Sequence, residues 1–183
     1  MAPETRKAIE HNIFTTGNYF YNGVGHYTVD YGKVISIGFG GMMREAAAEL
    51  AGCKPGDADY VTKTAMLKAM ILDYQAAIDY AARYADLAEQ EAAKESGQRK
   101  EELLTIASNC RTAPAEGAKT FWEACQVFWF IQQLIQIESS GHSISPGRFD
   151  QYMFPFYKKD LDAGKLTRDF AQELVDCIWV KLN

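Results

Sequence analysis

The sequence lacks the features that mark several common protein classes. Its 183 residues include only four cysteines and three histidines. These show neither a C-x-x-C pair nor the spacing of zinc ligands, so a structural zinc site and a disulfide framework are excluded. Aspartate and glutamate (24) outnumber lysine and arginine (19), which gives a formal net charge of -5. Because no basic surface is available to neutralise phosphates, we expect no nucleic-acid partner.

Long apolar segments and a secretory leader are also missing. The longest apolar run, residues 127–137, is interrupted by three glutamines and falls short of the roughly 20 residues that cross a bilayer. The first residues, MAPETRK, lead into no apolar core with a small-residue cleavage site. We therefore expect no membrane association and a cytoplasmic location. Apolar residues make up 48% of the chain and charged residues 23%, which is typical of one folded domain or a piece of a larger one.

Apolar residues at spacings of three and four predict a mainly α protein. The helix over 30–50 contains Gly38, Gly40 and Gly41 and is expected to kink, whereas residues 112–117 are expected to break the chain. The segment 120–138 is apolar on nearly all sides and should lie in the interior. Only 27–29 and 143–145 are suited to short extended pieces. The predicted helices cover 30–50, 60–94, 98–110, 120–138, 149–161 and, after an N-cap at Thr167, the residues up to Leu182.

Candidate reactive groups gather in two glycine-rich, non-helical segments. His26 follows two glycines in the first, and His142 and Ser143 stand beside Gly141 in the second, directly after the interior helix. Imidazole and hydroxyl groups in such places can bind a small polyol and move protons near neutral pH. The same side chains could instead satisfy backbone groups in ordinary turns. From the residues alone, both interpretations stay open.

Other catalytic patterns are not supported. Adjacent Ser and His do not make a triad, and the glycines follow no buried strand as a nucleotide-binding loop requires. Asp30 and Glu138 leave paired-carboxylate hydrolysis possible but unmotivated. Cys125 and Cys177 lie in apolar helical patterns, so both thiols are expected to be buried and inert.

Two long motifs give the sequence a family resemblance. Residues 19–34, YFYNGVGHYTVDYGKV, and 138–153, ESSGHSISPGRFDQYM, resemble the pyruvate formate-lyase domain of glycyl-radical enzymes. The runs FWEACQ at 121–126 and WVKLN at 179–183 resemble the same domain. The resemblance implies that the chain is the helical part of an α/β barrel domain.

The resemblance also implies a substrate pocket. One substrate-binding position is Arg in the formate-lyase branch, where it meets a carboxylate, and His in the glycerol dehydratase branch; here it is His26. Two further pocket positions are small in the first branch and His-Ser in the second; here they are His142 and Ser143. Since Arg is the residue suited to bidentate carboxylate binding, the expected substrate is a neutral diol such as glycerol or propane-1,2-diol. The choline trimethylamine-lyase and formate acetyltransferase branches remain alternatives.

The mechanism implied by the family uses parts that this chain lacks. A radical-SAM activating enzyme installs a glycyl radical, which passes to a cysteine; the resulting thiyl radical abstracts hydrogen from the substrate, and a neighbouring hydroxyl leaves as water. None of the cysteines here is followed by x-Glu, and no Gly-Tyr pair of a glycyl loop occurs. We therefore expect residues 1–183 to be an inactive partial domain without catalytic residues, directly bound cofactor or metal.

The last predicted helix supports this expectation. Its apolar stripe, which includes Leu174 and Ile178, continues to Asn183 without a glycine cap or polar tail. An internal fragment of a lyase that forms homo-oligomers is the preferred hypothesis, with the activating enzyme and a small polyol as partners. A non-catalytic helical interaction module is the alternative. A reading frame that continues into a Cys-x-Glu loop and a glycyl loop would exclude the module.

Overall fold

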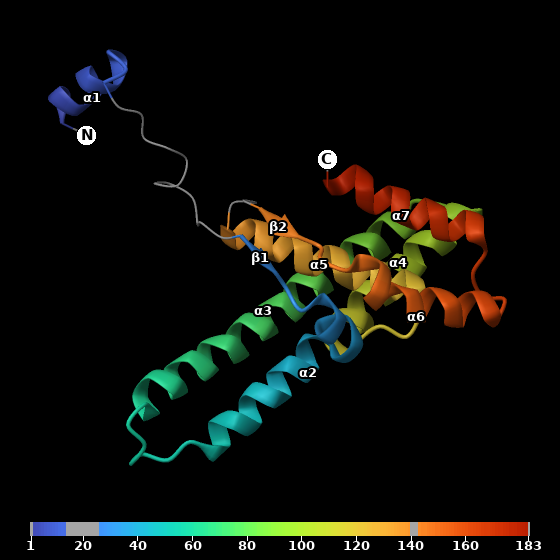
Figure 1. The fold of residues 1–183 in the computed structure, drawn as a ribbon. Coiled ribbons are helices and arrows are strands. Elements are labelled where there is room, and N and C mark those ends of the chain that lie inside the picture. The colour runs from blue at the N-terminus through green and yellow to red at the C-terminus, as the bar shows by residue number, and fades with distance from the viewer. Residues whose placement is uncertain (1, 14–25, 140–142, 183) are drawn as a thin grey trace.

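The computed structural model describes residues 2–13, 26–139 and 143–182. Within these ranges the chain forms seven helices and one pair of two-residue strands (Figure 1). The expectation of a mainly α fold is thus confirmed. The elements are α1 (Pro3–Glu10), β1 (Tyr27–Thr28), α2 (Tyr31–Gly52), α3 (Tyr60–Ala92), α4 (Gly97–Glu116), α5 (Phe121–Ser139), β2 (Ile144–Ser145), α6 (Phe149–Asp162) and α7 (Arg168–Leu182).

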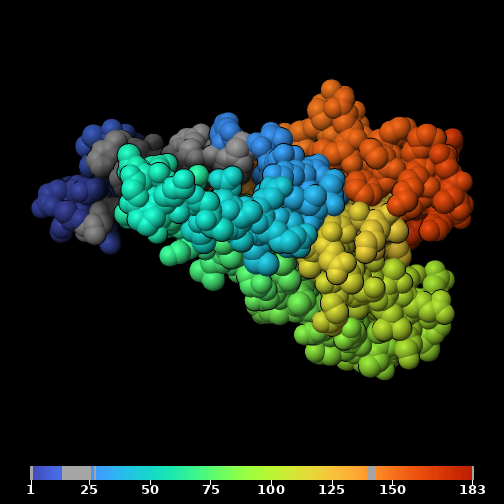
Figure 2. All heavy atoms as spheres, turned by 90° about the horizontal axis from the view of Figure 1, so that it is seen from below, coloured from blue at the N-terminus to red at the C-terminus, as the bar shows by residue number. Residues whose placement is uncertain are grey.

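Helix α5 lies at the centre of the packing. It contacts α2, α3, α4, α6 and α7, while α3 packs along both α2 and α4. The connection between α2 and α3 extends toward one end of the molecule, and α6 and α7 gather at the other (Figure 2). Helix α1 buries none of its residues and was not predicted, because it carries no broad apolar stripe.

The interior position predicted for the segment 120–138 is confirmed. Val127 and Phe128 of α5 are fully buried, and both belong to the main hydrophobic cluster together with Tyr31 and Ile35 of α2. The helix begins at Phe121, whose backbone N–H donates to the buried Asp160 carboxylate at 2.7 Å. A side chain of α6 therefore caps the first turn of α5, where backbone N–H groups have no partner within the helix.

The long helix α3 packs through small residues. A stripe of buried alanines at spacings of three and four runs along the half of the helix that faces α4 and α5. Since alanine has no side chain beyond Cβ, the partner helices can approach closely. Phe130 of α5 and Cys110 of α4 fill the space against this stripe. Its members are Ala77, Ala81, Ala85, Ala88 and Ala92.

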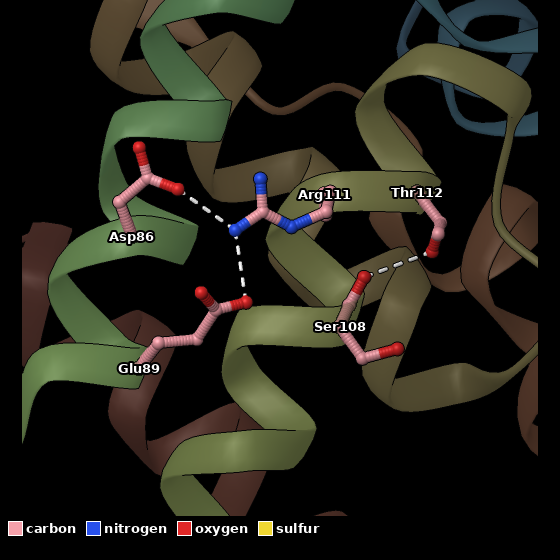
Figure 3. Close-up of polar contacts among 5 residues, drawn as sticks. All are labelled: Asp86, Glu89, Ser108, Arg111 and Thr112. Carbon is pink, nitrogen blue, oxygen red and sulfur yellow. Dashed lines mark hydrogen bonds and ion pairs between the residues drawn. The ribbon is translucent and has the colours of Figure 1, made fainter. Parts of the chain in front are cut away.

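Ion pairs on the surface also link α3 with α4 (Figure 3). The Arg111 guanidinium donates through Nη2 to Asp86 and to Glu89, both at 2.8 Å. Next to it, the Thr112 hydroxyl donates to the Ser108 carbonyl at 2.9 Å. Hydrogen bonding to the two carboxylates raises the pKa of Arg111. Because these side chains are exposed and solvent screens their charges, such pairs contribute little to stability, and the apolar contact does most of the stabilising.

The kink predicted for the helix over 30–50, which is α2, lies at Gly38. This residue has φ 67° and ψ 170°, a conformation that lies outside the helical region. A Cβ at this position would lie 2.5 Å from the Gly117 nitrogen, so only glycine allows the two backbones to meet. The Ala118 N–H donates to the Ile35 carbonyl at 2.7 Å, which closes the junction between the kink and the end of α4.

Two predictions about helices 4 and 7 require correction. The predicted break at 112–117 is wrong at its start, because α4 continues through Pro114 to Glu116 and ends at Gly117, with φ 91°. Pro114 is buried, so its packing offsets the helix hydrogen bond that proline cannot donate. Cys177 was expected to be buried but is exposed, since it lies one position away from the buried face of α7. The predicted N-cap of α7 is confirmed: the Phe170 N–H donates to the Thr167 hydroxyl at 3.1 Å.

None of the described helices is both long and apolar enough to cross a membrane.

Candidate functional site

The two glycine-rich motifs meet in a pair of parallel strands. Strand β1 pairs with β2 so that Tyr27 lies opposite Ile144 and Thr28 opposite Ser145. The two segments are more than a hundred residues apart in sequence, yet the strands lie side by side next to α5 (Figure 1). Both extended pieces predicted from the sequence are therefore present, and they form one unit.

The pairing brings two of the candidate residues to one end of the strands. His26 directly precedes β1 and Ser143 directly precedes β2, so these positions continue the register by one residue. Both residues are exposed. Ser143 adopts a left-handed backbone with φ 54°, which is uncommon for a residue other than glycine and often marks a functional turn. His142 lies outside the described residues, and its position beside His26 stays a prediction.

Two tyrosines that sequence reasoning missed support the strand pair. Tyr31 begins α2 just after β1, and its hydroxyl donates to the side-chain oxygen of Gln132 on α5. Tyr152 of α6 donates its hydroxyl to the Pro146 carbonyl, just after β2, at 2.8 Å. The two rings stack with centroids 5.8 Å apart and an angle of 16° between their planes. Each belongs to one of the two motifs, but no pattern within a motif indicates that they meet.

A glycine sets how closely the segments after the strands approach. Gly147 has φ 64°, and a Cβ there would lie 2.7 Å from the Thr28 methyl group. The Gly147 N–H donates to the Ser145 hydroxyl at 3.2 Å, so the turn after β2 folds back tightly beside β1. The next residue, Arg148, forms a two-pronged ion pair with Asp150 at 3.1 and 3.0 Å. That exposed guanidinium is therefore already engaged with an acidic partner.

Both carboxylates weighed as catalytic candidates lie at helix ends. Asp30 is the N-cap of α2 and accepts the Lys33 N–H at 3.1 Å, which is a structural role. Glu138 is exposed in the last turn of α5. In the described part of the chain no group of three or more potential metal ligands occurs.

The buried thiols have raised pKa values, whereas activated cysteines have lowered ones. Burial raises the pKa of Cys125 to about 12 and that of Cys110 to about 11. A reactive cysteine needs a lowered pKa, because the thiolate is the nucleophile. Burial also raises the pKa of Tyr152, with Tyr31 adding to the effect, so its hydroxyl stays a proton donor at physiological pH.

The fold and these paired motifs define the class to which the chain belongs. It is a member of the pyruvate formate lyase-like family, whose sequence model matches residues 1–183. The resemblance found in the sequence motifs is thereby confirmed.

Particular members of the family are closely similar. A solved structure concerned with 1,2-propanediol dehydration in Roseburia inulinivorans is 59% identical, with a TM-score of 0.88, over 100% of this chain and 23% of that chain. The glycerol-bound B12-independent glycerol dehydratase of Clostridium butyricum is 51% identical, with a TM-score of 0.86, over 100% of this chain and 23% of that chain. The (2S)-3-sulfopropanediol dehydratase of Klebsiella oxytoca is 43% identical over 172 residues, 93% of this chain and 21% of its own length. The chain thus spans between a fifth and a quarter of these relatives.

Proposed function

We propose that this chain is part of a glycyl-radical lyase that dehydrates a small diol, glycerol or propane-1,2-diol, and that it contributes to the substrate pocket. His26, His142 and Ser143 are the proposed substrate-binding residues. The cysteine and glycine that carry the radical would belong to the rest of the lyase, so residues 1–183 alone should be inactive. The radical-SAM activating enzyme, a homo-oligomeric assembly and a cytoplasmic location are parts of the same proposal.

One observation carries this proposal. The parallel pairing of β1 with β2 places the residue before each strand at the same end of the pair, and those residues are His26 and Ser143. A two-residue strand pair is too small to be stable without support from other elements. The pairing brings two residues that are distant in sequence to one place, where they can contact the same ligand.

The residue types suit the elimination of water from a neutral diol. An imidazole can accept or donate a hydrogen bond and can give up a proton near neutral pH, so His26 or His142 could hold one hydroxyl and protonate the departing one. The Ser143 hydroxyl offers a further donor and acceptor. In the complete lyase the glycyl radical would pass to the cysteine, and the resulting thiyl radical would abstract hydrogen from the substrate carbon.

The charge of the site favours a neutral substrate over a carboxylate. None of the three proposed pocket residues is an arginine, and Arg148, close by in the chain, is already paired with Asp150. A ketoacid pocket would need a free guanidinium for bidentate binding. Relatives described as glycerol dehydratase and as a protein of 1,2-propanediol dehydration support the same choice. The choline and formate acetyltransferase branches remain as alternatives within the family.

The test is an activity assay on the complete lyase that contains this sequence. After activation under anaerobic conditions, the enzyme is offered glycerol, propane-1,2-diol, choline, pyruvate and a sulfonated diol in separate reactions. We expect turnover of a neutral diol with a kcat/KM well above that for the other substrates. Preference for pyruvate or choline would refute the diol assignment, and an inability to be activated would favour the non-catalytic module.

Three histidines provide a matched set of variants. His26→Ala and His142→Ala should each lower kcat/KM by about a hundredfold or more, the low end of the range for a positioned acid–base group. His11→Ala is the control, because His11 is exposed at the end of α1, which buries none of its residues. Wild-type rates in folded His26→Ala or His142→Ala would refute the site assignment.

A further inference from the structure

The stacked tyrosines connect the two segments that carry the proposed pocket residues. Tyr31 follows β1 by three positions, and its N–H donates to the Val29 carbonyl at 2.8 Å. Tyr152 reaches back to the Pro146 carbonyl, directly after β2. The ring stack therefore joins the residues after one strand to those after the other. This contact is non-local and is independent of the strand hydrogen bonds.

Each tyrosine is itself fixed by the core. The Tyr31 ring is 1% exposed and lies 5.0 Å, centroid to centroid, from Phe128 of α5. Its hydroxyl is held by Gln132, which is 3% exposed. Tyr152 also packs against the first turn of α2, where a Cβ at Gly32 would lie 3.2 Å from the Tyr152 Cβ. A rigid interior therefore determines where the pair stands.

From these contacts we propose that Tyr31 and Tyr152 are positioning residues that hold the His26 and Ser143 segments at a fixed separation for substrate binding. The inference rests on the proposed function and identifies what maintains the geometry of that site. Neither tyrosine needs to touch the substrate. We call the stacked pair of Tyr31 and Tyr152 the clamp. Small displacements of binding groups reduce rates strongly, so the clamp would determine substrate affinity as well as stability.

The experiment uses conservative variants of the activated full-length lyase. Tyr152→Phe keeps the ring stack and removes the hydrogen bond to Pro146, and Tyr31→Phe keeps the stack and removes the bond to Gln132. Tyr80→Phe is the control, since it removes a tyrosine hydrogen bond, 3.2 Å to the Tyr84 hydroxyl, within helix α3 and outside both motifs. We expect about a tenfold loss of kcat/KM, mainly through KM, in the first two, the factor that corresponds to one hydrogen bond of ~1.4 kcal/mol. Tyr80→Phe should keep the wild-type kcat/KM.

A double-mutant cycle separates positioning from general weakening. If Tyr152 acts by positioning Ser143, the effect of Tyr152→Phe on kcat/KM should largely disappear in a Ser143→Ala background. Additive losses in kcat/KM would overturn the clamp. An active enzyme in which Tyr152→Phe and Tyr80→Phe have the same kcat/KM would overturn it as well.

A readout independent of activity distinguishes failure of the clamp from failure of the proposed function. Amide hydrogen exchange in the peptide that covers residues 143–148 should be about tenfold faster in Tyr152→Phe than in the wild type, and unchanged in Tyr80→Phe. If the wild-type lyase turns over no diol, the proposed function fails, and exchange alone decides whether the clamp orders this segment. Unchanged exchange would overturn the clamp in either case.

Discussion

Thr28 lies opposite Ser145 in the strand pair, and its methyl group occupies the space into which a side chain at Gly147 would project. The distance from the Thr28 Cγ2 to a Cβ built at Gly147 is 2.7 Å, shorter than ordinary contacts. The turn after β2 therefore depends on glycine for two reasons, its left-handed φ of 64° and the closeness of β1.

We predict that Gly147→Ala destabilises the protein by more than left-handed strain alone, which is about 1–2 kcal/mol. Gly164→Ala is the control, because Gly164 has φ 67° with nothing within 4 Å of its Cβ position. Urea unfolding should show the larger loss for Gly147→Ala. Thr28→Ser removes the opposing methyl group, so in that background Gly147→Ala should lose no more stability than Gly164→Ala. Equal losses for the two alanine variants with Thr28 present would contradict the contact.

The kink of α2 provides a second prediction. Gly38→Ala combines φ 67° with a Cβ 2.5 Å from backbone that cannot rotate away, so we expect a loss of more than about 3 kcal/mol or failure to fold. Gly97→Ala has φ 58° and open space around its Cβ position, and should lose only the strain energy. Thermal unfolding followed by circular dichroism compares the two, and a mild effect of Gly38→Ala would contradict the close backbone contact.

The buried cap of α5 provides a third. Asp160→Ala removes the acceptor of the Phe121 N–H and should lower the free energy of unfolding by about 1–3 kcal/mol, because a buried donor is left unsatisfied. Asp162→Ala breaks only the exposed ion pair with Lys158 and should change it by less than about 1 kcal/mol. Similar losses of unfolding free energy in chemical denaturation would show that the Asp160 cap contributes no more than an exposed ion pair.

Stability should fall at alkaline pH because of the buried thiols. Burial raises the pKa of Cys125 from 9.0 to about 12. Above pH 9 the Cys125 thiol is therefore deprotonated in the unfolded state but still protonated in the folded state, which shifts the equilibrium toward unfolding. The contribution is complete below pH 9 and declines by about 1.4 kcal/mol per pH unit as pH rises toward 12. Cys125→Ala should flatten this decline in unfolding measured from pH 8 to 11, whereas Cys177→Ala, at an exposed position, should not. An unchanged slope in Cys125→Ala would assign the effect to other groups.

Local patterns predicted the helices and strands well. The long helix from Tyr60, the kink at the Gly38 region and both short extended pieces followed from periodicity and glycine content, which depend on neighbouring residues only. The end of α4 was misplaced because Pro114 is stabilised by burial in tertiary packing, which overrides its local preference. Cys177 differs from a buried position by one residue, a shift of about 100° around a helix.

The candidate site was only partly accessible from sequence. The two motifs could be recognised, and their side-by-side arrangement is now seen for the segments of His26 and Ser143. The roles of Tyr31, Gln132 and Tyr152 could not be predicted, because their contacts join residues that are distant in the chain. Convergence of His142 on the same pocket remains a prediction.

From the great sequence separation of the two strands we also predict an order of folding. Closing so long a loop costs conformational entropy before any contact compensates for it, whereas α3 and α4 are neighbours in the chain and pack on each other extensively. We expect pulse-labelled hydrogen exchange to show protection of the α3–α4 hairpin before that of residues 143–148. The proposed substrate pocket would then be the last part of the described chain to assemble, which would link its occupancy by a ligand to the completion of folding.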